Sequence, residues 1–387
     1  MLENRLVTIA AVAFLSTFAG ASAQEQMRDT PGPIVAPEQA PVREIARPAG
    51  MSVVAPPPAG FDPQKASPQE LARYAFPPAP DAARAPHAYA SWQKVVQIRA
   101  GQVRPMGAQV NQSVNAPVLK PTTIYNRPIQ RAGQSVASAA RNSTVLSNSY
   151  NWSGTSVRNF TNPFNKEAII AEFVVPTARQ ALYTCNGGWD YSSLWPGIDG
   201  NGSTDVLQAG VEVDSYCRNY NTQSFYSAWI EWYPYPETQV STPTIGPGDL
   251  IYIEVWNVSP TAGYATIVNL STQQGASYNL TAPAGTSLVG NSAEWIVERP
   301  GVSGGLASLT NYVGSSWTFG VAWDYTASPV TYYFPGLDPG GASTFEIITM
   351  LDGNNKGISS PTIENAGFLY FQDYGSACGN PYGSPPC

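Results

Sequence analysis

Residues 146–387 are predicted to form an all-β fold, a sandwich of two antiparallel sheets. Short runs of aromatic and β-branched residues fill this part of the chain, and Gly, Asn, Ser and Thr recur between the runs. This pattern is typical of strands joined by turns. Helical periodicity is almost absent, and roughly 240 residues suit one large sandwich.

Four runs alternate with a period of two, which places successive side chains on opposite faces of a strand. Gln208 and Glu212 share the polar face of the first run, and Tyr252, Glu254 and Trp256 share one face of the third. A face of carboxylates and aromatic rings is expected of a sheet curved around an extended polymer, either peptide or sugar. The four runs are 206–214, 226–233, 251–258 and 293–298.

The first 23 residues predict a secretory signal peptide. Arg5 precedes an apolar run from Leu6 to about Phe18, and Ala21-Ser22-Ala23 provides a cleavage site. The apolar run is too short to span a bilayer comfortably, and no later segment approaches the ~20 apolar residues that spanning needs. We therefore expect a secreted, extracellular or periplasmic protein without a membrane partner. An N-terminal membrane anchor is the alternative.

Residues 24–145 predict a proline-rich leader, a pro-segment that buries little by itself. The stretch 24–141 holds 18 of the 35 prolines, and only 69–74 and 90–100 look helical. It carries 13 Lys and Arg against 7 Asp and Glu, a net charge of +6, whereas 142–387 carries 6 against 19, a net charge of −13. The opposite charges predict attraction between leader and body, unless both merely reflect composition.

Cysteine usage and charge limit the possible partners. All four cysteines lie in the body of an exported chain, where oxidation is permitted, and sequence proximity favours Cys185 with Cys217 and Cys378 with Cys387. Their irregular spacing makes a cysteine-only zinc site the weaker interpretation. The acidic body argues against nucleic acid as a partner, since phosphate binding requires Lys and Arg. We expect a monomer whose partners are its substrate and its own leader.

His87, in the leader, is the only histidine of the chain. A Ser-His-Asp triad, a Cys-His dyad, a His-ligated zinc and a His general base all require an imidazole. Any chemistry in the body therefore uses carboxylates and amides. Carboxylates act as acid and base most readily near their own pKa of roughly 4, so we expect an acid-active enzyme or no enzyme.

Eight segments of the body, in order, resemble the glutamic peptidases, or eqolisins. Those around Gln208 and Glu294 are the most specific. The resemblance implies a concanavalin-like jelly roll of two antiparallel sheets and acid endopeptidase activity, with neither metal nor cofactor. The segments are 151-NWSG-154, 171-AEFVVP-176, 195-WPGIDG-200, 206-VLQAGVEVD-214, 226-YSAWIEWYP-234, 246-GPGDLIYIEV-255, 268-VNLSTQQ-274 and 292-SAEWIVE-298.

The same resemblance implies a catalytic dyad of Gln208 and Glu294. Glu294 would take a proton from the attacking water and return it to the leaving amine, while Gln208 would orient the water and donate to the oxyanion. The resemblance also suggests that Trp195, Asp199 and Glu231 border the cleft. Pro196 departs from the family, which usually has an aliphatic residue there, so the backbone near Trp195 is expected to differ.

Two alternatives remain open from the residues alone. A carbohydrate-active sandwich would use Glu294 and Glu231 as acid and nucleophile at a separation of about 5–5.5 Å. A non-catalytic module would bind polysaccharide or protein. Trp229 shares a face with Glu231 and could form a cleft wall, although most tryptophans belong to the core. Glu212 and Asp214 are expected to be surface charges.

Overall fold

The computed structural model describes residues 50–101, 124–132, 144–158, 166–181, 188–219, 221–302, 305–340 and 343–374. The predicted signal peptide and the leader up to residue 49 lie outside the described residues, as do Cys185, Cys378 and Cys387. Cys217 is disulfide-bonded, and the pairing of the cysteines stays a prediction. No helix in the described part of the chain is long and apolar enough to cross a membrane.

Strands dominate the body, and nearly all pair antiparallel, which confirms the all-β prediction. The first layer contains the strands that carry the predicted dyad. In spatial order it consists of β20 (Thr344–Leu351), β4 (Trp152–Arg158), β14 (Ser292–Glu298), β7 (Ser193–Ile198), β8 (Val206–Arg218), β9 (Asn221–Tyr233) and β10 (Thr238–Val240). At its borders, β3 (Thr144–Ser149) runs parallel to β20, and β6 (Gly188–Tyr191) joins β8 to β17 (Ser308–Leu309).

The second layer packs against the first, and the two are linked where β20 pairs with β21. Its strands are β1 (Ser52–Val54), β13 (Gln274–Thr281), β12 (Ala262–Asn269), β11 (Leu250–Ser259), β5 (Glu167–Val174), β18 (Gly314–Asp324), β19 (Thr331–Tyr333), β22 (Phe368–Asp373) and β21 (Gly357–Asn365). A separate small sheet pairs β2 (Ile124–Tyr125) with β15 (Gly301–Val302) and β16 (Gly305–Leu306).

The core between the layers follows the period-two alternation of the sequence. Leu207, Ala209 and Val211 of β8 pack there with Ile251 and Ile253 of β11. Burial of such side chains stabilises the fold by roughly 1.5–3 kcal/mol each. The opposite faces of the same strands are thereby turned outward, where other parts of the chain cover them.

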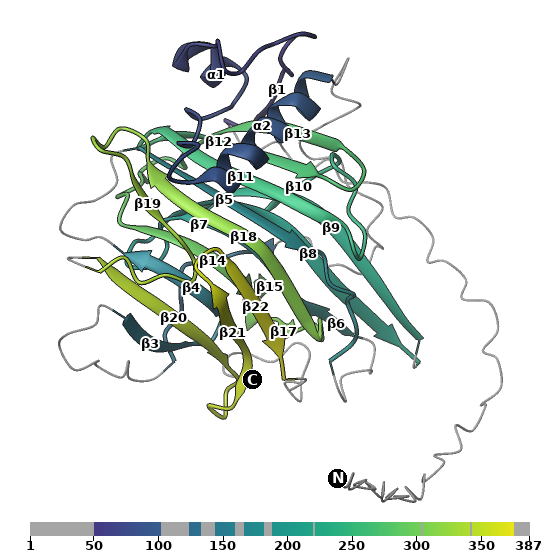
Figure 1. The fold of residues 1–387 in the computed structure, drawn as a ribbon. Helices are drawn as coiled ribbons and strands as arrows, with labels where there is room; N and C mark the ends of the chain where they lie inside the picture. Colours follow the sequence, from purple (N-terminus) through teal and green to yellow (C-terminus); the bar gives the residue numbers. More distant parts are fainter. Residues whose placement is uncertain are drawn as a thin grey trace, which may run out of the picture. The chain divides into compact units, whose positions relative to one another are not determined.

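Two helices of the leader cover the outer face of the second layer (Figure 1). They are α1 (Pro68–Arg73) and α2 (Pro86–Gly101), close to the predicted helical stretches. Ser67 caps α1 by accepting from the backbone N–H of Glu70, whose carboxylate accepts from the Ser67 N–H in return. Trp92 of α2 is fully buried in this contact.

The polar face of β11 does not meet a substrate, contrary to the sequence-based expectation. Tyr252 and Trp256 pack in the cluster under the leader helices, and the Trp256 indole donates to the Ala75 carbonyl at 3.2 Å. Alternation correctly grouped Tyr252, Glu254 and Trp256 on one face. It could not reveal that the leader covers this face, because the leader is far away in sequence.

Candidate active site

One row of side chains crosses the first layer from β20 to β9. Directly paired residues of neighbouring strands point to the same face, so the row can be read from the register. Its members are Glu346 of β20, Ser156 of β4, Glu294 of β14, Gly197 of β7, Gln208 of β8 and Glu231 of β9.

Gln208 and Glu294 are separated only by Gly197 in this row. Because neighbouring strands lie about 4.8 Å apart, the two backbones are about 10 Å apart, and both side chains extend over the intervening glycine. A Cβ on Gly197 would come within 2.8 Å of the Trp195 ring. The absence of a side chain there lets that ring fold against the strand and leaves the space between Gln208 and Glu294 free of a neighbouring side chain from β7.

Pro196 lies inside β7 and pairs with Trp295 of β14. On the other side of β7, the register with β8 is recorded for residues 193, 194, 197 and 198. Proline has no backbone N–H to donate, which accounts for a ladder interrupted next to Gln208. The departure from the family pattern thus falls within a central strand, directly before Gly197, the residue that faces Gln208.

Aromatic rings form the floor beside the row. Trp195 contacts Trp152 edge to face with ring centroids 5.0 Å apart, and both are fully buried with Trp229. Val206, Ile296 and Ile348 complete this cluster. Trp195 and Trp229, two predicted cleft residues, lie on the same face as the row, because each is two residues from a member of the row in its own strand.

Gln208 uses both hydrogens of its carboxamide. Its Nε2 donates to Oε2 of Glu231 at 2.5 Å and to the backbone oxygen of Asn126 at 2.7 Å. An amide nitrogen has two N–H groups, so these contacts fix which end of the carboxamide faces each neighbour. Glu231 thus orients Gln208, and the second N–H points at a peptide carbonyl.

Glu294 is completely buried, and this burial raises the pKa of its carboxyl group well above the ordinary value. The hydroxyl of Ser156 donates to its Oε1 at 3.5 Å, a long contact. The positive charge of Arg158 acts in the opposite direction and lowers the pKa. With the site covered, burial therefore favours the neutral form of Glu294.

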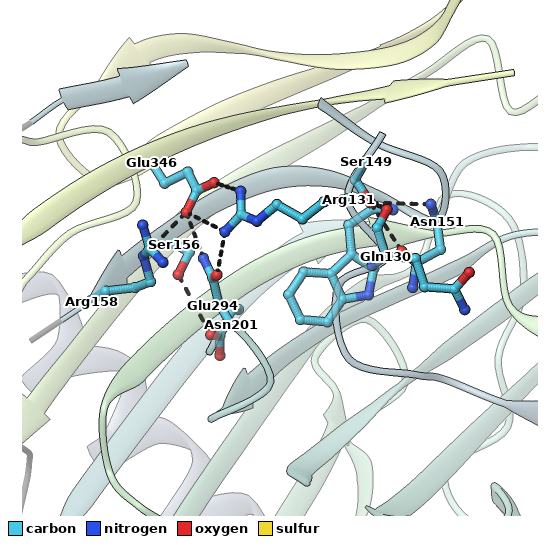
Figure 2. A network of polar contacts seen from close by, with 10 residues as sticks. Gln130, Arg131, Ser149, Asn151, Ser156, Arg158, Asn201, Glu294 and Glu346 are labelled. Atoms are coloured by element: carbon cyan, nitrogen blue, oxygen red, sulfur yellow. Dashed lines mark hydrogen bonds and ion pairs between the residues drawn. The ribbon is translucent and has the colours of Figure 1, made fainter. Parts of the chain in front are cut away.

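A stretch of the leader, residues 124–132, covers the row, and we refer to it as the covering segment. Its Ile129 packs against the aromatic floor, and the Gln130 N–H donates to Oδ1 of Asn151 at 2.7 Å. The N–H of Arg127 donates to Glu298 at 3.0 Å. Figure 2 shows the Gln130 end of this segment beside Ser149 and Asn151.

The far end of the row holds a cluster of charges. Arg131 forms an ion pair with Oε1 of Glu346 and donates to its Oε2 at 3.2 Å, while Arg158 contacts Oε2 at 3.2 Å (Figure 2). Asn201 donates to the same carboxylate at 2.8 Å and accepts from Arg131 at 2.8 Å. Burial raises the pKa of Glu346, but these contacts outweigh it, and the pKa lies below the ordinary value.

Asp199 supports the site without facing the row. It is fully buried, and its carboxylate accepts from the backbone N–H groups of Val289, Gly290 and Asn291 at 2.6, 2.9 and 2.8 Å. These residues directly precede β14. Asp199 therefore anchors the turn that delivers Glu294 to its place in the row.

Glu298, Glu346 and the covering segment were not predicted from the sequence as parts of the site. Glu298 is buried and accepts from the Trp195 indole at 3.0 Å as well as from Arg127. Its position four residues after Glu294 in β14 placed it on the same face, which was an available signal. Glu212 and Asp214 were expected on the surface, but both are fully buried. Across the described ranges, no three His, Cys, Asp or Glu side chains are grouped so as to hold a metal ion.

Two curated proteins are similar to part of this chain. Aspergillopepsin-2 of Aspergillus niger is 34% identical over 145 residues, which are 34% of this chain and 50% of the relative. Scytalidopepsin B of Scytalidium lignicola is 33% identical over 130 residues, 33% of this chain and 47% of the relative. The aligned part thus spans about half the length of these curated relatives.

Solved structures of similar proteins include a scytalido-glutamic peptidase bound to a peptide-based transition state analog. It has 22% identity and a TM-score of 0.44, covering 58% of this chain and 98% of that one. Aspergilloglutamic peptidase from Aspergillus niger has 25% identity and a TM-score of 0.40, covering 48% and 99%.

A family model also matches more than half of this chain. It is the model of the Peptidase A4 family, and it covers residues 150–368. This range begins just before β4 and ends at the first residue of β22. This range contains every member of the row, from Ser156 to Glu346, and excludes the leader. The chain belongs to the Peptidase A4 family, the eqolisins or glutamic peptidases.

Proposed function

We propose that this chain is the zymogen of a secreted, acid-active endopeptidase in which Gln208 and Glu294 activate a water molecule. The observation that carries the proposal is the contact of Gln208 with a peptide carbonyl. Its Nε2 donates to the Asn126 oxygen at 2.7 Å, and Glu294 stands on the same face one strand beyond Gly197. This contact supports the proposal because the leader peptide occupies the position that we propose for the substrate.

The chemistry follows from the two side chains. Ionised Glu294 takes a proton from water, whose oxygen attacks the scissile carbonyl carbon. The Gln208 carboxamide donates to the oxygen that becomes negative, and Glu231 holds the carboxamide in the donating orientation. Glu294 then returns the proton to the departing amine as the carbon–nitrogen bond breaks. A carboxamide does not titrate, so this donor persists in acid.

The leader keeps this site closed in the proposed zymogen. The row beneath the covering segment is fully buried at Gln208, Glu231 and Glu294, so no external peptide can reach it. Activation then requires cleavage after the covering segment and its departure. Acid would favour this departure where ion pairs hold it, since protonated carboxyl groups no longer attract Arg131.

The geometry disfavours the carbohydrate-active alternative. A retaining glycosidase needs two carboxyl groups about 5–5.5 Å apart. Glu231 and Glu294 lie three strands apart, so their backbones are about 14 Å apart. Gln208 stands between them in the row and is hydrogen-bonded to Glu231.

The test is digestion of a protein substrate from pH 2 to 7 by the full chain and its variants, with self-processing followed by mass spectrometry. We expect Gln208→Ala to lower kcat by roughly 10²–10³-fold and Glu294→Gln by at least about 10²-fold. Gln223→Ala on β9 and Glu364→Gln on β21, both exposed, are the matched controls and should remain active. Activity retained in Gln208→Ala or Glu294→Gln would refute the dyad.

A further inference from the structure

We infer that Glu346 and Asn201 form a specificity subsite for a basic side chain of the substrate, and that Arg131 occupies it in the unprocessed chain. This inference rests on the proposed function. Glu346 belongs to the same row as Glu294, with only Ser156 between them. A peptide that crosses the row past the dyad therefore continues toward Glu346.

The covering segment is long enough to reach from Gln208 to Glu346. From Gln208 to Glu346 the row advances four strands, about 19 Å. From Asn126, whose carbonyl meets Gln208, to Arg131 the chain advances five residues, about 16 Å when extended, and the long arginine side chain covers the remainder. The segment therefore runs across the strands, and both of its ends are held by side chains of the row.

Alternate side chains of the covering segment enter the site. Ile129 packs on the cluster of Trp152, Trp195 and Trp229, and Arg131 reaches Glu346 two residues later. Gln130, between them, is held by its backbone: its N–H donates to Asn151, and its carbonyl accepts from the Tyr150 N–H at 2.8 Å. The site thus selects an aliphatic residue followed, two positions on, by a basic one.

The chemistry at Glu346 matches a cation better than a neutral side chain. Its carboxylate is fully buried and already lies beside Arg158. Its two oxygens nevertheless bind a second cation, because Arg131 forms an ion pair with Oε1 and donates to Oε2 at 3.2 Å. Asn201 presents its carbonyl oxygen to that cation at 2.8 Å while its amide group holds Glu346. Two acceptors that contact the same guanidinium are typical of a preformed arginine-binding site.

The experiment uses processed enzyme and pairs of peptides with an internally quenched fluorophore. Within each pair, the basic residue is arginine or citrulline, which has nearly the same shape and no charge. Its position is scanned over the residues flanking the cleaved bond. We expect one position at which arginine raises kcat/KM by roughly 10- to 100-fold over citrulline. In Glu346→Gln that ratio should fall toward one, and in Glu364→Gln, an exposed control, it should not change.

The outcomes separate the inference from the proposed function. Equal cleavage of arginine and citrulline peptides at every position overturns the subsite and leaves the peptidase intact. Cleavage of no peptide by the wild type overturns both. The comparison of peptides on the wild-type enzyme does not depend on how well Glu346→Gln folds. A second measurement, inhibition by synthetic 124–132 peptide with arginine or citrulline at position 131, should show the same ratio.

Discussion

The leader contacts the body through two regions that differ in kind. Residues 50–101 bury Leu71, Phe76 and Trp92 against the outer face of the second layer. The covering segment meets the first layer mainly through hydrogen bonds and the ion pair of Arg131 with Glu346, beside the apolar contact of Ile129. The first region gains free energy by removing apolar surface from water, whereas the second depends on charge and on hydrogen-bond geometry. We therefore expect the covering segment to leave the site while the helices remain docked.

The largest expected effect comes from the apolar region. Trp92→Ala removes a fully buried indole and should destabilise the docked helices by about 3–5 kcal/mol. Hydrogen exchange of residues 68–101, compared with the wild type, measures this loss. Amides of the covering segment should keep most of their protection, because their partners lie on the other layer. Equal loss of protection in both regions would mean that the leader is one cooperative unit.

A smaller and more local effect is expected in the covering segment. Arg131→Gln removes the ion pair with Glu346 but keeps a side chain that can donate to Asn201. The contact of the covering segment should weaken by about 1.5–3 kcal/mol, the value of hydrogen bonds to charged groups. We expect faster self-processing and faster hydrogen exchange of the amides of residues 124–132. Hydrogen exchange of α2 should not change. Unchanged processing and unchanged exchange would mean that this ion pair does not hold the segment.

The two regions also differ in what the sequence reveals. Helices near 69–74 and 90–100 were predicted from local sequence, and they were found as α1 and α2. The covering segment reads as proline-rich linker, and its partners are distant: Asn126 meets Gln208, and Arg131 meets Glu346. Nothing in local propensity encodes these contacts, because they depend on how the sheet brings distant residues into one row.

Within the body, the sequence predicted faces better than partners. The period-two alternation placed Gln208 and Glu294 on the polar faces of their strands, and the register brings Gln208 into direct contact with Glu231. It also grouped Tyr252 with Trp256 but attributed their face to substrate, although the leader covers it. Glu346 escaped notice because a single carboxylate in 344-TFEIITML-351 shows no pattern, and its neighbours in the row come from other strands.

The pH should act on the covering segment through Glu346. The pKa of Glu346 in the covered state is lowered, so its contribution to closure is full above the ordinary value of 4.5 and is lost as pH falls through the lowered pKa. Glu231, Glu294 and Glu298 have raised pKa values because they are buried, so they oppose closure as pH rises. In a Glu294→Gln background, the amides of residues 124–132 should therefore lose protection against hydrogen exchange below pH 4.5.

In the Glu294→Gln background, the additional change Glu346→Gln should abolish the loss of amide protection below pH 4.5. The loss of protection at high pH, which Glu231 and Glu298 govern, should stay the same. The groups facing Glu346 are Arg131, Arg158, Asn201 and Ser147. An acid-side loss of protection of equal size in the doubly changed chain would assign the pH response to another group.

Salt should have the smallest effect, and it should separate the two regions most clearly. The charge difference between leader and body predicts that salt at neutral pH loosens the leader, but α1 and α2 are held by an apolar cluster that salt does not screen. The ion pair of Arg131 is partly exposed on the arginine side, with 35% of that side chain accessible. Raising NaCl from 0.15 to 1 M should therefore weaken the covering segment by less than about 1 kcal/mol and leave the helices docked. Release of α2 by salt, measured by exchange, would show that long-range attraction rather than apolar burial holds the helices.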